Sequence, residues 1–301
     1  MQEIGTDAPE ACVSRSFLFV PGDSERKLEK AAVSNADALI IDLEDSVTRA
    51  KRPEARVITR TFLDNHAERN LWVRINPLDT EDALADLREV MPAGPAGIVL
   101  PKPKSAKDAI QLAKLLDVFE QESKLPEGQT SIIPVATERP AALFHLDEYA
   151  NATPRLAGLT WGAEDLSAAV GATTNRDSEG NWLPPYELAR SLCLFAASAS
   201  NVPALDTVFT DYKDMEGLAR YASNARRDGF SGMLAIHPAQ VDPINEAFMP
   251  SSEEINRAKR IIELFADNPG AGVLSMGGEM IDRPHWLQAK RILKVAQQDQ
   301  Q

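Results

Sequence analysis

Length, composition and charge restrict what this protein can be. The chain of 301 residues contains 44% hydrophobic and 26% charged residues, which is ordinary for a globular protein with two domains or one large α/β barrel. The net charge of −13 argues against nucleic acid or an anionic membrane as a partner, although a local cationic pocket can still bind an anionic substrate.

Cysteine usage and the absence of targeting signals favour the cytoplasm. Cys12 and Cys193 lie far apart and form no CxxC motif, so no disulfide framework is expected. The opening MQEIGTDAPE is acidic and polar, unlike a signal peptide, and no run approaches the roughly 20 apolar residues of a transmembrane helix.

Eight short apolar runs, each ended by a turn or a polar residue, predict buried strands. They cover residues 16–20, 37–43, 71–75, 96–100, 132–137, 156–163, 204–209 and 232–236. The segments between them predict helices at 24–34, 53–66, 80–90, 105–121, 140–149, 186–200, 211–227 and onward to 248. Residues 173–185 are polar and contain Gly and Pro, which predicts a loop over the strand ends.

This alternation favours an α/β fold of the (β/α)₈ TIM-barrel type, because eight such units normally occupy about 250 residues. An open doubly wound sheet is the alternative, but no GxGxxG or GxxxxGK[ST] loop follows any strand. We assign residues 12–248 to the catalytic barrel and residues 249–301 to a C-terminal helical extension.

The extension allows two interpretations. Ser251 and Glu254 have capping-box spacing before the helical segment 255–265, and GAGVLSMGGEMIDRP then precedes a final amphipathic helix through Val295. The extension is either a pair of helices that packs on the barrel, or a mobile arm or lid that carries Asp282 to an active site.

Ionisable residues mark the ends of most predicted strands. In a barrel these carboxyl-terminal ends meet in one mouth. Each residue taken alone has an ordinary explanation as a cap or an ion pair, but together they predict a cavity that contains acids and cations. They are Asp42, Glu44, Asp45, Arg74, Lys102, Glu138, Asp165, Asp206 and His237.

Glu138 and Asp165 follow consecutive strands and suit Mg²⁺, which prefers oxygen ligands and often binds only one or two protein carboxylates. The alternative is that both residues cap helices. The chain has no HExxH motif or other paired histidines, which argues against a zinc site.

Two cations complete the expected site. Arg74, within LWVRIN, suits bidentate binding of a carboxylate or enolate, or an ion pair with Asp42 or Glu44, and both can hold at once. Lys102 lies between two prolines, and a Schiff base there would need a depressed pKa, whereas the neighbouring acids favour a metal. A metal, an arginine and an acid or base are the groups needed to stabilise an enolate during carbon–carbon cleavage or formation.

Seven motifs in this order carry a family resemblance: RSFLFVPGD, DALIIDLEDSV, VRIN, GIVLPK, WGAEDLS, AIHPAQ and GGEMIDRP. From about Arg15 to Ile292, the sequence resembles the citrate lyase β-subunit-like branch of the HpcH/HpaI aldolase family. The resemblance implies a TIM-like barrel that forms a homotrimer or a dimer of trimers. It also implies Mg²⁺-dependent cleavage or formation of a 3-hydroxy-acyl-CoA thioester, such as malyl-CoA, citramalyl-CoA or citryl-CoA, with a small 2-oxo acid as partner.

Three other functions fit the same motifs. The first is a malyl-CoA-type thioesterase on the same scaffold, and the second is the β subunit of a citrate lyase complex. The third is a non-catalytic binding module that retained the barrel.

Matching motifs imply a role for individual residues. Glu138 and Asp165 would bind the metal, and Arg74 would bind the oxygens of the substrate. Glu44 and Asp45 would surround the water ligands of the ion.

Other implied roles concern the substrate and the proton. Asp282 would exchange a proton with the acetyl-CoA carbon, reaching the site of a neighbouring subunit. Lys102 and Arg15 join Arg74 and Glu138 as candidates for substrate contacts.

Two features leave the thioester specificity open. Arg15, Lys27 and Lys51 are candidate CoA contacts that are equally explained as surface charges. The family usually has IETP- or IESA-like residues around the metal glutamate, whereas this chain has ATERP, in which Arg139 adds a cation at the rim.

Overall fold

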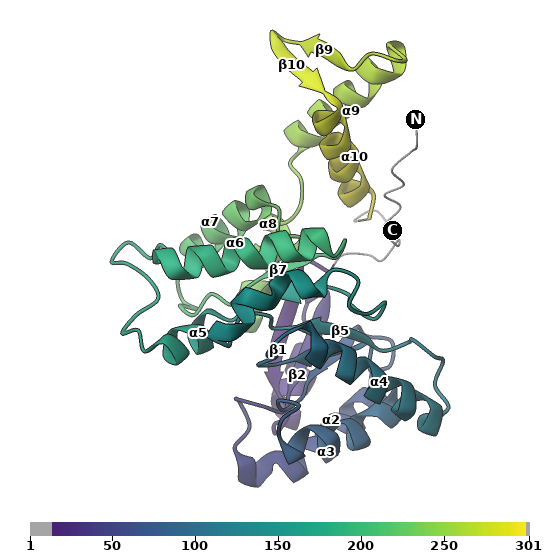
Figure 1. Ribbon diagram of the computed structural model, residues 1–301, viewed down its shortest axis with the longest axis vertical. Helices are drawn as coiled ribbons and strands as arrows, with labels where there is room; N and C mark the ends of the chain where they lie inside the picture. Colours follow the sequence, from purple (N-terminus) through teal and green to yellow (C-terminus); the bar gives the residue numbers. More distant parts are fainter. Residues whose placement is uncertain (1–13, 299–301) are drawn as a thin grey trace. The chain divides into compact units, whose positions relative to one another are not determined.

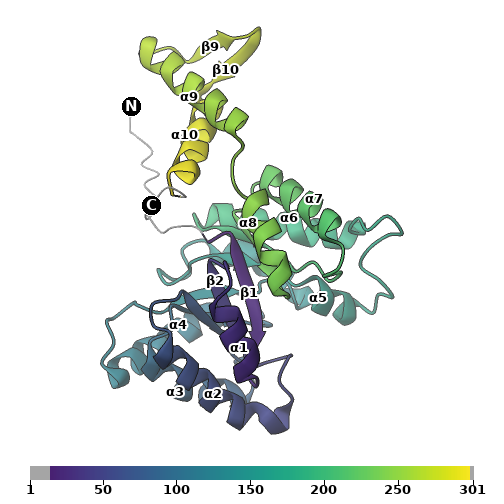
Figure 2. The ribbon, with the colours of Figure 1, turned by 180° about the vertical axis from the view of Figure 1, so that it is seen from behind.

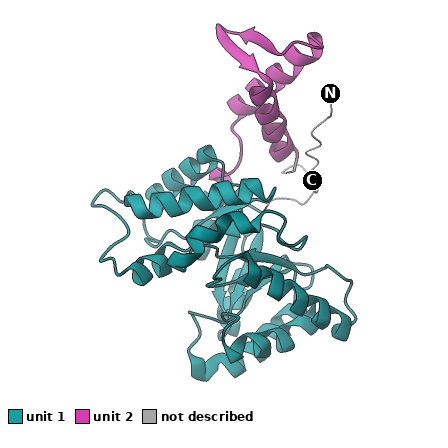
Figure 3. Ribbon diagram, in the orientation of Figure 1, with its two compact units in different colours: residues 1–245 teal, residues 246–301 magenta. Residues whose placement is uncertain are grey.

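The computed structural model describes residues 14–298. Residues 12 and 13, at the start of the expected barrel, and residues 299–301, at the end of the expected extension, lie outside the described residues. The chain divides into two compact units, residues 1–245 and 246–301 (Figure 3). Within residues 14–298, no helix combines the length and apolar character needed to span a membrane.

Eight parallel strands form the centre of the first unit. They are β1 (Ser16–Pro21), β2 (Ala38–Asp42), β3 (Leu71–Arg74), β4 (Gly97–Leu100), β5 (Ser131–Pro134), β6 (Leu159–Thr160), β7 (Ala204–Asp206) and β8 (Gly232–Ala235). Their order is β5-β4-β3-β2-β1-β8-β7-β6, and parallel bridges Ile132–Leu156 and Val135–Thr160 join β5 to the β6 segment. The sheet is therefore a nearly closed barrel, which confirms the predicted TIM-type fold.

Helices cover the outside of the strands. Figure 1 shows α2, α3 and α4 along one side of the barrel and α6 and α7 along another, while Figure 2 shows α1 over β1 and β2. The α-helices are α1 (Glu25–Ala32), α2 (Arg52–Asn65), α3 (Glu81–Val90), α4 (Ala106–Ser123), α5 (Ala163–Val170), α6 (Pro184–Ala199), α7 (Met215–Asp228) and α8 (Val241–Ala247). The 3₁₀ helices are η1 (Arg49–Lys51), η2 (Met91–Ala93), η3 (Pro140–Tyr149) and η4 (Pro238–Gln240).

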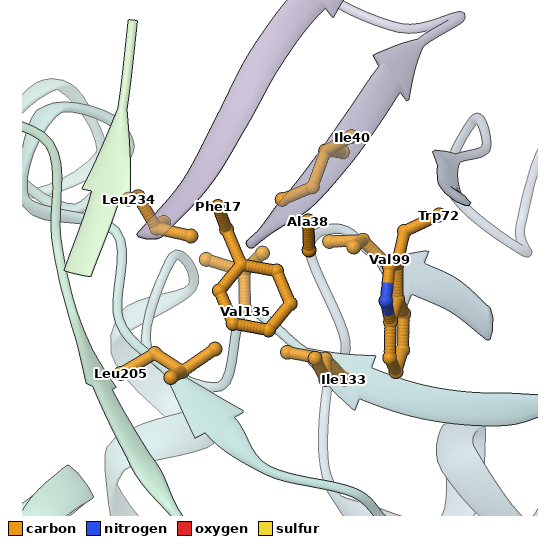
Figure 4. Close-up of a cluster of buried hydrophobic side chains, with 9 residues drawn as sticks. All are labelled: Phe17, Ala38, Ile40, Trp72, Val99, Ile133, Val135, Leu205 and Leu234. Atoms are coloured by element: carbon orange, nitrogen blue, oxygen red, sulfur yellow. The ribbon is translucent and has the colours of Figure 1, made fainter. Parts of the chain in front are cut away.

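Alternate positions of the strands fill the barrel, because every second residue of a strand faces the same side. Figure 4 shows the cluster that results, made of Phe17, Ala38, Ile40, Trp72, Val99, Ile133, Val135, Leu205 and Leu234. Gly97 makes room for the largest of these side chains, since a Cβ atom there would lie 2.1 Å from a ring carbon of Trp72. The interior is thus a packed core, and the functional groups must lie above it.

One local prediction in this unit is wrong. The predicted long strand 156–163 is reduced to Leu159–Thr160, because Ala163–Val170 forms the helix α5 with two acidic residues in its first turn. Acidic side chains at that position interact favourably with the helix dipole, a signal that the apolar run concealed. Pro140–Tyr149 is helical as expected, but with 3₁₀ hydrogen bonding.

The second unit consists of α9 (Ser252–Asp267), β9 (Val273–Met276), β10 (Glu279–Asp282) and α10 (Arg283–Gln298). The capping box of Ser251 and Glu254 is present at the start of α9. The two strands form an antiparallel hairpin, whereas the sequence predicted a purely helical extension. Ile281, on β10, is fully buried against α9 and α10 in a small core of its own.

A buried ion-pair network stabilises the amino-terminal side of the β4–β6 region. Arg155 donates to both carboxylate oxygens of Glu120, at 2.8 and 2.6 Å, to Asp117 at 2.6 Å, and to the carbonyl of Thr130. Backbone N–H groups of Gly128 and Thr130 also donate to Glu120. Burial would raise the pKa of Glu120, but Arg155 and these N–H groups lower it to about 2.

We expect Arg155→Met to lower the free energy of unfolding by about 3–5 kcal/mol, because it leaves the buried Glu120 carboxylate without its counter-ion. Urea unfolding at pH 7 measures this loss. The matched control is Arg60→Met, which breaks the exposed Arg60–Asp64 pair and should change stability by less than about 0.5 kcal/mol.

The same pair predicts a pH dependence. The pKa of Glu120 is lower in the folded protein than its ordinary value of 4.5, so this stabilisation is complete above pH 4.5 and is lost as the pH falls toward 2. The difference in the free energy of unfolding between wild type and Arg155→Met should therefore become smaller in acid. A difference in unfolding free energy that stays constant down to pH 3 would contradict a stabilising role for the Arg155–Glu120 ion pair.

Candidate functional site

Strand register places Asp42 and Arg74 side by side at the mouth of the barrel. Asp42 lies two residues beyond the inward-facing Ile40, and Arg74 lies two beyond the inward-facing Trp72, so both continue the interior rows. Arg74 Nε and Nη2 each donate to one oxygen of Asp42 at 2.7 Å, and the guanidinium lies 4.7 Å above the ring of Phe19. This bidentate pair fixes the guanidinium in position.

Burial opposes ionisation of Asp42, but Arg74 and the N–H groups of Glu44 and Ser46 outweigh it and lower the pKa of Asp42. Arg74 has five N–H donors, and Asp42 accepts two of them. The other side of the guanidinium remains directed at the acidic cluster, with Nη1 3.3 Å from Glu44 Oε2.

Glu44 is a second buried acid of the DLEDS segment, beside Asp42. Only 3% of its side chain is exposed, and burial raises its pKa in spite of Arg74 and Lys102. Among residues 14–298, its Oε2 atom has no partner with hydrogen-bond geometry. Asp45 is half-exposed, and both of its carboxylate oxygens lie 3.1 Å from Lys102 Nζ.

Lys102 crosses the acidic cluster from the end of β4. Its Nζ atom lies 2.5 Å from Glu44, 3.1 Å from Asp45 and 3.2 Å from Asp165. Burial would lower the pKa of this ammonium, but the three carboxylates raise it above its ordinary value. A Schiff base requires the opposite shift, so these ion pairs argue against that alternative.

Glu138 is the buried carboxylate of the site, with an exposed fraction of 3%. Burial, together with Asp165 and Glu44, raises its pKa to about 8 from an ordinary 4.5. The N–H group of Lys102 donates to Glu138 Oε2. A Cβ atom at position 162 would lie 2.5 Å from Glu138 Cγ, so Gly162 is what allows the Glu138 side chain to approach the WGAEDLS segment.

Asp165 lies in the first turn of α5, where the helix dipole favours a negative charge. Its side chain is 35% exposed and contacts the Lys102 ammonium. The adjacent Glu164 is exposed and accepts a hydrogen bond from Asn175 instead. Of the two acids in the motif, Asp165 is therefore the one that joins the cluster.

Three acidic or basic residues at the rim were only partly foreseen. Arg139 Nη2 lies 2.9 Å and Lys104 Nζ lies 3.2 Å from the same oxygen of Asp79. A cavity of about 260 Å³ opens here, and Asp79, Lys102, Lys104, Asp108 and Gln111 are among the residues that line it. No sequence signal marked Asp79, because it follows an ordinary Asn-Pro turn.

Three expected mouth or substrate residues are used elsewhere. Arg15 pairs with Asp37 at the amino-terminal start of β1 and β2, at the opposite end of the strands from the cluster. Asp206 is fully buried among donors from Trp161, Arg190 and Tyr221. His237 caps η4, and its ring stacks on Tyr212.

Asp282 ends β10 in the second unit, directly before α10. Its Oδ1 atom lies 2.5 Å from His285 Nδ1, and about one third of each side chain is exposed. The structure therefore assigns Asp282 to a hairpin and gives it a histidine partner.

The oxygen-rich cluster fits a hard divalent cation. Five carboxylates, namely Asp42, Glu44, Asp45, Glu138 and Asp165, surround two cations, Arg74 and Lys102. A bound cation would lower the raised pKa of Glu138 and would interact favourably with Glu44 Oε2, which accepts no hydrogen bond from residues 14–298. However, in the described part of the chain no three His, Cys, Asp or Glu side chains are arranged to bind one ion together, so a site here would use fewer than three protein ligands. Two protein carboxylates with water and substrate oxygens are the coordination that Mg²⁺ commonly takes.

Known proteins resemble this chain over nearly its full length. Residues 15–238 match the model of the HpcH/HpaI aldolase/citrate lyase family. The citrate lyase subunit beta of Leuconostoc mesenteroides subsp. cremoris is 35% identical over 286 residues, which cover 94% of this chain and 93% of that protein. The (3S)-malyl-CoA thioesterase of Cereibacter sphaeroides is 34% identical over 294 residues, which cover 96% and 97%.

Structural similarity agrees with these matches. The crystal structure of CitE from Mycobacterium tuberculosis, in complex with magnesium, acetoacetate and coenzyme A, has a TM-score of 0.78 and 32% identity. The match covers 96% of this chain and 100% of that chain. By sequence, motif order and barrel structure, this protein belongs to the HpcH/HpaI aldolase/citrate lyase family of enzymes.

Proposed function

We propose that this enzyme is a Mg²⁺-dependent CoA-ester lyase that breaks or forms a carbon–carbon bond in a 3-hydroxy-acyl-CoA such as malyl-CoA, citramalyl-CoA or citryl-CoA. The observation that carries the proposal is the buried Glu138 carboxyl, whose pKa is raised to about 8 beside Asp165 and within the field of Arg74. CitE of Mycobacterium tuberculosis supports it, since its structures contain magnesium with acetoacetate and coenzyme A, or with pyruvate or oxaloacetate.

In this proposal Glu138 and Asp165 hold the ion. Magnesium, when bound, supplies Lewis-acid polarisation of a substrate oxygen. Glu44 and Asp45 would accept hydrogen bonds from water around a bound ion. Lys102 holds Glu44, Asp45 and Asp165 together through its ammonium.

Arg74 binds the carboxylate of the 2-oxo acid half. Asp42 occupies its Nε and one Nη2 hydrogen, which leaves N–H groups that can donate to the substrate. The guanidinium is held by Asp42 and by the face of Phe19, so it need not reorganise as negative charge develops.

Bond cleavage needs one proton for the departing acetyl unit. The carbon–carbon bond breaks, the hydroxyl-bearing carbon becomes the carbonyl of the 2-oxo acid, and the electron pair passes to the thioester enolate. Asp282 donates a proton to the enolate carbon, which gives acetyl-CoA. The substrate hydroxyl proton then replaces the proton that Asp282 has lost. We propose that Asp282 acts in the site of a neighbouring subunit of a homotrimer or hexamer.

A panel of substrates tests the reaction. Incubation with malyl-, citramalyl- and citryl-CoA should release acetyl-CoA with glyoxylate, pyruvate or oxaloacetate, respectively, for the substrate that is accepted. Removing Mg²⁺ with EDTA should stop turnover, and adding Mg²⁺ again should restore it. No turnover of any of the three with Mg²⁺ present would contradict a lyase that acts on free CoA esters, and would leave a β subunit of a citrate lyase complex or a non-catalytic binding module.

A thioesterase is the second candidate, because a (3S)-malyl-CoA thioesterase is 34% identical over 96% of this chain. The same panel separates the two activities, since hydrolysis of malyl-CoA gives free CoA and malate. A role as the β subunit of a citrate lyase complex, supported by the 35% identical citrate lyase subunit beta, would require an acyl-carrier partner and low activity on free CoA esters.

A further inference from the structure

Lys102 contacts both proposed ligands of the ion through different atoms. Its backbone N–H donates to Glu138 Oε2, and its Nζ atom lies 3.2 Å from Asp165 Oδ1. The first contact uses the backbone N–H group, whereas the second depends on the ammonium. Substitutions at this residue therefore separate ligand placement from charge.

The backbone of Lys102 holds these contacts in place. Pro101 and Pro103 flank it, and its φ of +49° lies in the left-handed region, which is uncommon for a residue other than glycine. Such strained residues persist where the surrounding structure over-determines them, often at functional sites. From this backbone the ammonium reaches the cluster and contacts Glu44, Asp45 and Asp165.

The ammonium competes with a divalent ion for the same negative charge. It lies within 3.2 Å of oxygens of Glu44, Asp45 and Asp165, and less than a quarter of its side chain is exposed. An ion bound to Asp165 would be a like-charged neighbour of this ammonium. Repulsion between two such cations is stronger in a partly buried site than in water.

We propose that Lys102 is a positioning residue whose ammonium limits the affinity of the site for divalent cations. It keeps Glu44, Asp45 and Asp165 together as a preformed acidic cluster. It also neutralises part of the negative charge that would otherwise attract the ion. This inference rests on the proposed metal site at Glu138 and Asp165. It differs from a role for Lys102 in binding substrate, because its signature is the ion affinity measured without substrate.

Titration calorimetry with Mg²⁺ at pH 8, without substrate, tests the proposal. Lys102→Met should bind Mg²⁺ at least about tenfold more tightly than wild type, because the competing charge is gone while the N–H donor to Glu138 remains. Lys102→Arg, which keeps the charge, should stay near wild type. The matched control is Lys104→Met, two residues along the same loop as Lys102. It removes an exposed ammonium that pairs with Asp79, and it should change Mg²⁺ affinity by less than about twofold.

Unchanged or weaker binding by Lys102→Met would overturn the proposal, as would tight binding by Lys102→Arg. Lys102→Gln keeps a donor for Glu44 without the charge, so it should reproduce the tighter binding in a folded protein, which circular dichroism verifies. Asp165→Ala distinguishes a failure of the proposed metal site from a failure of the proposed role of Lys102. If wild type and Asp165→Ala bind Mg²⁺ equally, the proposed metal site is wrong. If only Asp165→Ala loses binding and Lys102→Met gains none, only the role of Lys102 is wrong.

Discussion

Glu138→Gln is expected to reduce Mg²⁺-dependent turnover by at least about 100-fold, since a neutral amide is a poor ligand for a hard cation. Mg²⁺ affinity, measured by calorimetry, should fall with it. The control is Glu164→Gln, which alters an exposed acid one residue before Asp165 and should leave affinity within about twofold of wild type. Wild-type turnover and affinity in Glu138→Gln would exclude Glu138 as a ligand.

The same substitution should stabilise the protein when Mg²⁺ is absent. The pKa of Glu138 is raised to about 8 from 4.5, so the folded state retains a proton that the unfolded state releases between these values. Wild-type stability therefore falls as the pH rises from 4.5 toward 8. Glu138→Gln removes this penalty and should gain about 1–3 kcal/mol at pH 8, with little gain near pH 5.

Metal binding should show the corresponding pH dependence. Mg²⁺ must displace the proton of Glu138, so its affinity should rise with pH and level off above about 8. Calorimetry in buffers of different ionisation enthalpy counts the released protons. An affinity that does not vary between pH 6 and 8 would contradict protonated Glu138 as the starting state.

Asp282→Asn is expected to reduce turnover by about 100- to 10,000-fold, the range for loss of a general acid, with Mg²⁺ affinity unchanged. Exchange of the acetyl-CoA methyl protons with deuterium, followed by NMR, should slow equally. Glu279→Gln, on the same strand but paired with Arg257, is the matched control and should retain turnover. Full exchange activity in Asp282→Asn would remove it from the mechanism.

Mixing two inactive variants tests which subunit supplies Asp282. If Asp282 serves the site of a neighbour, co-assembled Glu138→Gln and Asp282→Asn chains should regain up to about a quarter of wild-type activity, because some sites then combine two intact residues. If each chain completes its own site, the mixture should stay inactive. The mixture therefore separates the two arrangements without a change in fold.

Sequence periodicity was enough to predict the barrel and the direction of its mouth. Eight apolar runs of strand length separated by amphipathic segments leave few arrangements other than a closed parallel sheet, and parallel strands bring their carboxyl ends together. That reasoning brought forward Glu44, Arg74, Lys102, Glu138 and Asp165, which the structure collects in one cluster. The family motifs added magnesium and the thioester chemistry.

Contacts between distant segments could not be predicted in the same way. The same reasoning also gave Asp206 and His237, but Asp206 is satisfied by Arg190 and Tyr221, and His237 caps a 3₁₀ helix. Arg15, chosen for its charge, pairs with Asp37 at the other end of the strands. An ionisable residue at a strand end does not reveal its partners, because they come from elements far away in the sequence.

The sequence by itself determined the fold class, the family and which strand ends carry acids and cations, because these depend on local periodicity and motif order. Only the tertiary structure decided that Lys102 pairs with three carboxylates and that burial raises the pKa of Glu138. These properties depend on distances of a few ångströms and on exclusion of water, and both arise only when the barrel closes.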